Sequence, residues 1–191
     1  YASISKVLME QGEKKESKKA MQESLRVASE ITNYRNKSRA YASISKVLME
    51  QGEKKESLRV ASEITDDFHK SQAYLSISTI LMEQGEKEES LRVASEITVD
   101  RLKSQAYLSI STILMEQGEK KESKKAMQES LRIASGITND TTKYKAYALI
   151  SKVLMEQGEK EESLRVASEI IDDRLKSEAY ASISKILMEQ G

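Results

Sequence analysis

The sequence predicts an all-α protein built as a solenoid of stacked helical hairpins. The motif Leu-Met-Glu-Gln-Gly occurs six times at intervals of 33 or 40 residues, ending at Gly12, Gly52, Gly85, Gly118, Gly158 and Gly191. A fixed period of this length is the signature of a repeat protein whose copies bury their apolar faces only by stacking on neighbours. The chain also lacks proline, which would interrupt helices. We therefore expect about five and a half repeats, with six first helices and five second helices.

The first half of each repeat is predicted to form a helix that ends just before the motif glycine. In the copy that begins at Ser71, apolar residues recur at helical spacing on one stripe, which consists of Ala73, Tyr74, Ile77, Ile80 and Leu81. Gly85 follows this stripe, at the place where a left-handed residue commonly closes a helix. The small Ser78 indicates a close crossing of two helices. Tyrosine recurs at the position of Tyr74 in every copy, and we expect these rings to be largely buried between repeats.

The second half of each repeat carries another apolar stripe, which predicts the second helix of a hairpin. Between Glu86 and Ile97 this stripe is formed by Ser90, Leu91, Ala94 and Ile97. Acidic residues occupy its first turn, where they interact favourably with the helix dipole. The acid pairs Asp66-Asp67 and Asp172-Asp173 precede first helices, and we interpret them as caps rather than as metal ligands.

Two copies carry seven additional residues, Lys18–Ser24 and Lys124–Ser130. Seven residues are nearly two helical turns, so an insert of this length rotates the apolar face of a helix by only about 20°. The inserts also continue the apolar stripe, through Ala20-Met21 and Ala126-Met127. We therefore expect continuous second helices from about residue 14 to 31 and from about residue 120 to 137.

The composition excludes several classes of protein and favours a cytoplasmic one. Lysine plus arginine and aspartate plus glutamate both number 31, and zero formal net charge does not favour binding to nucleic acid. The absence of cysteine excludes disulfides and thiol catalysis. No apolar run approaches the ~20 residues that span a bilayer, and no signal-peptide pattern is present. His69 is alone at a variable connector position, so we expect no enzyme activity, no cofactor and no metal site.

The repeat resembles the tetratricopeptide repeat. The resemblance covers essentially the whole chain and rests on Tyr74, Ile77, Ser78, Leu81, Gly85, Ser90, Ala94 and Ile97. It implies a right-handed solenoid whose first helices line a concave face, and a scaffold for protein–protein interaction. The pattern is also similar to the pentatricopeptide repeat, which reads RNA, although the neutral charge weakens that alternative. A structural spacer without a ligand is the remaining alternative.

A groove for a peptide or a partner helix is expected along the first helices, since the resemblance places them on the concave face. Methionines at one equivalent position in each copy would add adaptable apolar surface, with ordinary packing as the alternative interpretation. Likewise each groove lysine can pair with a glutamate four residues on. The candidate groove residues are Leu75, Thr79, Met82, Glu83, Leu108, Thr112, Met115, Glu116, Lys46, Met49, Lys152 and Met155.

Residues 1–191 are interpreted as a single helical repeat domain and as a piece of a longer array, because the chain starts inside a repeat. The final segment keeps the internal apolar pattern, including Ile183 and Leu187, although no second helix follows it. We expect part of this surface to be open, and Tyr1 begins the first copy equally abruptly. Exposed apolar surface tends to find a partner, so we expect head-to-tail self-association through the terminal helices.

Overall fold

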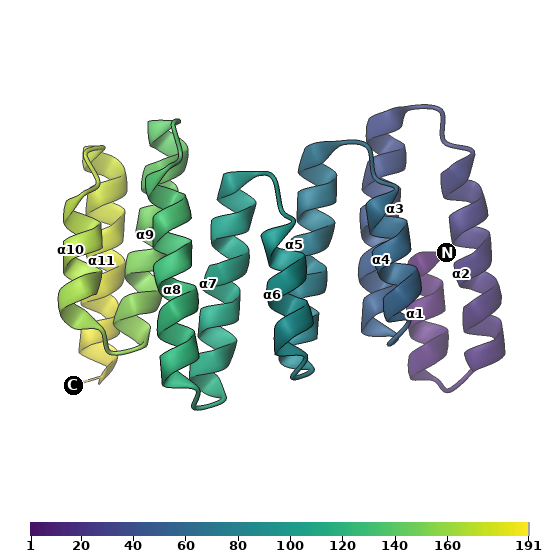
Figure 1. The fold of residues 1–191 in the computed structure, drawn as a ribbon, viewed down its shortest axis with the longest axis horizontal. Helices are drawn as coiled ribbons and strands as arrows, with labels where there is room; N and C mark the ends of the chain where they lie inside the picture. The colour runs from purple at the N-terminus through teal and green to yellow at the C-terminus, as the bar shows by residue number, and fades with distance from the viewer. Residues whose placement is uncertain (191) are drawn as a thin grey trace. The chain divides into compact units, whose positions relative to one another are not determined.

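The computed structural model describes residues 1–190, with side chains as far as Glu189, and confirms the predicted all-α class. Every regular element in this range is an α-helix, and neighbouring helices pack as hairpins of a helical repeat protein (Figure 1). Gly191 and its expected role as a turn glycine lie outside the described residues.

The contacts divide the chain into two compact units, Tyr1–Val99 and Asp100 onward. A single domain over residues 1–191 stays a prediction. Unit 1 contains α1 (Ala2–Glu10), α2 (Lys14–Ser29), α3 (Tyr34–Glu50), α4 (Lys54–Ser62), α5 (Asp67–Glu83) and α6 (Lys87–Ser95). Unit 2 contains α7 (Asp100–Glu116), α8 (Lys120–Ser135), α9 (Asp140–Glu156), α10 (Lys160–Ser168) and α11 (Asp173–Gln190). The odd-numbered elements are the predicted first helices.

The described motif glycines close the first helices as predicted. All five have φ between 79° and 83°, the left-handed region that favours glycine. At Gly85 the glycine N–H donates to the carbonyl of Met82 (3.0 Å), and the N–H of Glu86 donates to the carbonyl of Leu81 (2.9 Å). These two bonds satisfy carbonyls that the end of α5 would otherwise leave without a partner, and they turn the chain into α6.

Short polar side chains begin four of the first helices. Asp66 accepts a hydrogen bond from the backbone N–H of His69 (3.0 Å), and Asp172 accepts one from that of Leu175 (2.8 Å). Asn33 and Asn139 cap α3 and α9 in the same way. The interpretation of the aspartate pairs as caps is therefore confirmed.

Buried serines join the two helices of each hairpin. Ser90 Oγ donates to the carbonyl of Ser78 (2.7 Å), and both serines are fully buried. Every described hairpin repeats this link between residues twelve apart in sequence. The small side chain allows two helix backbones to approach closely, which confirms the close crossing expected at Ser78.

The inserts extend the second helices without a break, as predicted. α2 and α8 have 16 residues each, whereas α4, α6 and α10 have 9. Both long helices end two residues before the expected boundary. In unit 2 the extension adds a second buried link, in which Ser104 and Ser130 each donate to the other's carbonyl at 3.0 and 2.8 Å.

The tyrosine series is buried in only two of its six positions. Tyr74 and Tyr147 are 7% and 4% exposed; Tyr74 lies near Glu96, and Tyr147 is hydrogen-bonded to Glu169, both just after the end of the following second helix. Tyr41, Tyr107 and Tyr180 are half-buried, and Tyr1 is 60% exposed. The prediction that each ring is largely buried is therefore confirmed at Tyr74 and Tyr147 and wrong at Tyr1, while the other three rings are covered only in part.

The terminal helices also differ in part from the expectation. Ile183 is only 2% exposed, and α11 packs against both α9 and α10, so Ile183 does not belong to the open part of the terminal surface. Leu187 is 37% exposed, as expected. At the other end, α1 exposes Ile4 and Val7 at 54% and 49%.

Candidate functional site

The twelve candidate groove residues all lie on first helices, but they differ widely in exposure. Glu83, Glu116, Lys46 and Lys152 are exposed, and Leu75, Thr79, Thr112 and Met115 are half-buried. The side chains of Met49, Met82 and Met155 are completely buried, and Leu108 is 4% exposed. The open part of the candidate surface is therefore more polar than the sequence predicted.

The methionines do not form a continuous exposed ladder. Met49, Met82 and Met155 belong to short copies and are core residues, which agrees with the alternative interpretation as ordinary packing. Met9 and Met115 belong to the long copies and remain half-exposed. In unit 2 the half-exposed Met115 lines an opening between α8 and the start of α10, together with Met127 and Leu154.

Groove lysines pair with glutamates four residues on. Lys46 Nζ lies 3.9 Å from Glu50, and Lys152 Nζ lies 3.6 Å from Glu156. Glu50 also binds Lys6 of α1 at 2.8 Å, and this hydrogen bond raises the pKa of Lys6. The lysines thus have partners within the protein, so an approaching ligand would compete with these pairs.

Two hollows lie along the first helices. In unit 1 a hollow of about 280 Å³ between α3 and α5 is lined by Lys46, Arg39 and Gln72 among others. In unit 2 a hollow of about 170 Å³ between α7 and α9 is lined by Leu108 and Leu149. Each hollow is therefore lined by one of the predicted groove residues, Lys46 in unit 1 and Leu108 in unit 2.

Leu149 is the residue that the sequence interpretation missed. Its side chain is 42% exposed at the rim of the hollow in unit 2. Every other copy has serine at the equivalent position, namely Ser3, Ser43, Ser76, Ser109 and Ser182. A comparison of the copies position by position would have identified this single apolar replacement.

The second helices carry a different repeated feature, an arginine held between two glutamates. Arg92 donates to Glu89 from Nε at 2.8 Å and contacts Glu96 one turn further on. This hydrogen bond lowers the pKa of Glu89. The same arrangement at Arg26, Arg59 and Arg165 confirms that the mixed charges of these helices form local ion pairs.

His69 contacts residues at the start of its own helix. Its Nδ1 lies 2.6 Å from the Asp66 carboxylate, and its ring contacts the edge of Phe68. The backbone N–H of His69 is the largest cause of the lowered pKa of Asp66. Among residues 1–190, no three histidine, aspartate or glutamate side chains gather closely enough to hold a metal ion. Nor does any helix of the described chain combine the length and apolar character needed to cross a bilayer.

Comparison with known proteins identifies one repeat directly. Residues 104–136 match the family model described as tetratricopeptide repeat. This segment corresponds to most of α7, the glycine turn and α8, so it is the hairpin of the second long copy. No curated protein and no solved structure matches the chain significantly.

Proposed function

Because this chain is a tetratricopeptide-like helical repeat protein, we propose that it is a scaffold that binds a peptide or a partner helix along its first helices. The observation that carries the proposal is the tetratricopeptide match over a folded hairpin, since such repeats are generally protein-interaction modules. Repeat folds of this kind are typically non-catalytic, and we propose no enzyme activity. The cytoplasmic location stays a prediction.

The proposed contact surface consists of the open first-helix residues. In unit 2 it is centred on Leu149, which supplies an exposed apolar side chain at the rim of the hollow between α7 and α9, and it includes the half-buried Thr112 of α7. In unit 1 it includes Lys46, Leu75 and Thr79, with Glu83 at the helix end. The buried Met49, Met82, Met155 and Leu108 act as the support beneath this surface. An apolar anchor with a polar rim is the usual anatomy of a protein interface.

RNA binding is less well supported than peptide binding. The exposed candidate residues include both glutamates and lysines, and the two groove lysines already pair with glutamate. A phosphate backbone requires an excess of cationic side chains, and its affinity falls steeply with salt. Steep salt-dependent binding of a single-stranded oligouridine would favour RNA instead.

The test compares two leucines of equal exposure. Leu149 and Leu164 are both 42% exposed, but Leu149 lies on a first helix and Leu164 on a second helix. The immobilised chain is used to select peptides from a random peptide library, and the affinity of the selected peptides is then measured by fluorescence anisotropy. Leu149→Ser should weaken binding, whereas Leu164→Ser should leave it unchanged. Equal effects, or no selected peptides, would contradict the proposed surface.

A further inference from the structure

Each long copy forms a cleft with the copy that follows it, and equivalent residues build the two clefts. In unit 1 the cleft lies between α2 and the start of α4 and has a volume of about 320 Å³. In unit 2 it lies between α8 and the start of α10 and has a volume of about 700 Å³. Both are separate from the first-helix hollows described above.

The seven-residue inserts supply one wall of each cleft. Lys18 and Met21 of the first insert line the cleft in unit 1, and their equivalents Lys124 and Met127 line the cleft in unit 2. The insert lengthens the second helix by about 10 Å, at 1.5 Å per residue, so a long second helix stands opposite a short one. The cleft is therefore a consequence of the length difference between successive copies.

A glutamine fixes the base of each cleft. Gln51 Nε2 donates to the hydroxyls of the buried pair Ser5 and Ser17, at 3.0 and 3.3 Å. In unit 2 the equivalent Gln157 donates to Ser111 at 3.3 Å. Each glutamine thereby connects the first helix of the following copy to the hairpin of the long copy. This hydrogen bond positions the two walls independently of any ligand.

The floor of each cleft is apolar. In unit 1 it includes the buried Met21 and Leu48, with Met9 and Leu25 half-exposed beside them. The residues at the same positions in unit 2 are methionine and leucine again. Methionine adapts its shape to different apolar side chains, which suits a surface that receives a flexible ligand.

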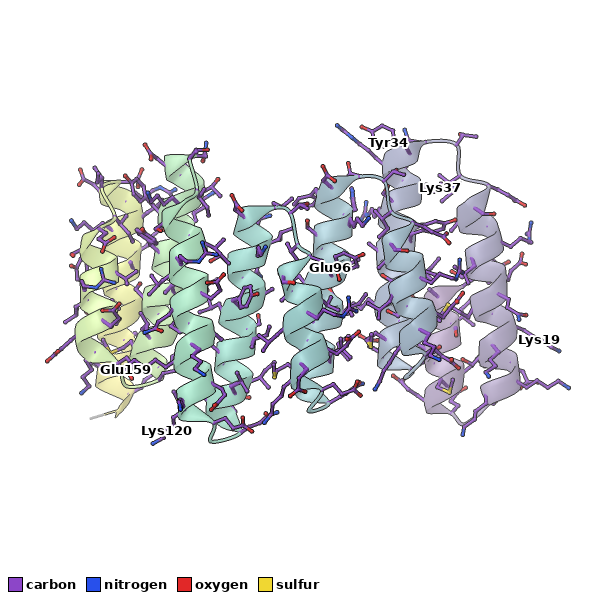
Figure 2. All side chains as sticks on the ribbon, in the orientation of Figure 1. Lys19, Tyr34, Lys37, Glu96, Lys120 and Glu159 are labelled. Carbon is purple, nitrogen blue, oxygen red and sulfur yellow. The ribbon has the colours of Figure 1, made fainter. Side chains whose placement is uncertain are left out.

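The two walls carry opposite charges. Lysine lies on the insert wall, and Glu53 or Glu159 lies at the start of the short helix opposite. In unit 1 Lys18 Nζ lies 3.7 Å from Glu53, so this ion pair crosses the narrower cleft. Figure 2 shows Lys120 and Glu159 at the same end of unit 2, at the starts of α8 and α10. A ligand that enters between the walls must replace a lysine–glutamate ion pair such as this one with ion pairs of its own.

We propose that each cleft binds a linear peptide segment of a partner protein in which an apolar side chain lies between one acidic and one basic residue. The apolar side chain enters between the methionines and leucines, the acidic residue pairs with Lys18 or Lys124, and the basic residue pairs with Glu53 or Glu159. Charge complementarity selects such a segment over a uniformly acidic or basic one. Because the clefts are equivalent, one chain binds two segments.

The probe is a set of synthetic twelve-residue peptides with a central leucine or methionine. Glutamate, lysine, glutamine and serine are varied on both sides of it, and binding to the 191-residue chain is measured by isothermal titration calorimetry. Peptides with glutamate on one side and lysine on the other should bind most tightly, with two peptides per chain. Peptides with two like charges should bind less well.

Reversing the charge of the insert lysine tests whether the peptides bind in the clefts. Lys124→Glu should weaken binding to one of the two sites about five- to tenfold, as expected for losing one ion pair and gaining repulsion. Lys125→Glu is the matched control, since Lys125 is exposed and lies outside the cleft lining. In unit 1 the corresponding pair is Lys18→Glu and Lys19→Glu; the Lys19 side chain points away from α2 into solvent (Figure 2).

A peptide with a compensating charge shows whether a variant loses binding because its ion pair is lost or because the chain misfolds. A peptide whose glutamate is replaced by lysine should recover affinity for the Lys124→Glu chain. The proposal is overturned if no peptide in the set binds, or if binding survives in the double variant Lys18→Glu and Lys124→Glu. Loss of binding in Leu149→Ser but not in the lysine variants would also overturn it and would assign the peptides to the first-helix surface.

Discussion

Glycine occurs at two kinds of helix end in this chain, and its backbone conformation distinguishes them. Gly85 has φ of +80°, which a residue with a Cβ adopts at a cost, whereas Gly136 has an ordinary right-handed conformation with φ of −79°. A Cβ added at Gly136 would have only an ordinary contact of 3.5 Å with the Ile133 carbonyl. The two sites therefore predict opposite effects of the same substitution.

Gly136→Ala should raise the free energy of unfolding by about 0.4–1 kcal/mol, because alanine reduces the conformational entropy of the unfolded chain. Gly85→Ala should lower it by about 1–2 kcal/mol, since alanine is disfavoured in the left-handed region. Urea unfolding followed by circular dichroism provides both values. A loss at Gly136 would mean that this helix end needs the backbone freedom of glycine.

The buried serines lead to a second comparison at single-residue scale. Ser90→Ala removes one hydrogen bond to the Ser78 carbonyl and should cost about 1 kcal/mol. Ser90→Val adds volume where two helices approach closely and should cost more, about 1–3 kcal/mol beyond the alanine variant. Thermal unfolding of the two variants separates the effects. Equal costs would show that the hydroxyl group, and not the small size, is required.

Residue-level burial could be predicted only in part from the sequence. The period of the apolar residues identified the stripe that contains Ile77 and Leu81, and both are fully buried. It could not show that Met82, beside that stripe, is buried while the equivalent Met115 is half-exposed. Met82 belongs to a copy with a short second helix and Met115 to a copy with a long one, a difference that a pattern within the first helix does not contain.

At the scale of elements, the second helices combine a packed face with a repeated ion pair cluster. Arg92 lowers the pKa of Glu89 below the ordinary value of 4.5 through a charge-assisted hydrogen bond. A carboxyl group with a lowered pKa in the folded state contributes stability above its unfolded pKa. That contribution is lost as the pH falls through the folded-state pKa.

Arg92→Gln should therefore destabilise the protein at pH 7 by less than about 1 kcal/mol, because the pair is exposed and screened by solvent. The difference between this variant and the unmodified chain should shrink once the pH falls below 4.5 and carboxylates become protonated. Melting temperatures measured between neutral and acidic pH check this. Arg39→Gln in α3 is the control, since Arg39 does not lie between two glutamates in this way. If its melting temperature difference from the unmodified chain changed with pH in the same manner, the effect could not be assigned to the Arg92 cluster.

The element lengths could be predicted from the sequence, but the clefts could not. The motif glycines, the polar caps and the seven-residue inserts determine where helices begin and end. The cleft between α8 and α10 arises only when a long second helix is placed beside a short one in three dimensions. The sequence contains the signal, because each long copy is followed by a short one, but it does not indicate the position of the opening.

At the scale of the whole molecule, the first helix of the chain exposes a face that other copies bury. Ile4 is 54% exposed, whereas its equivalents Ile44 and Ile77 are 2% and 0% exposed. In these two copies the preceding first helix packs against the helix that carries the isoleucine, α1 against α3 and α3 against α5. At the other end α11 exposes Leu187 and Met188, at 37% and 77%. These two faces are chemically suited to each other, since both are apolar surfaces on first helices.

We therefore expect the 191-residue chain to associate head to tail at high concentration, with α1 of one molecule against α11 of another. Such a contact is heterologous and can extend from chain to chain. The double variant Ile4→Lys and Met188→Lys should abolish the association, because it places like charges on both apolar faces. Val27→Lys in α2 is the control, as Val27 is 37% exposed but lies on a second helix. Light scattering over a concentration series measures the mean mass. A mass that does not rise with concentration would mean that the exposed residues of α1 do not form a contact between chains.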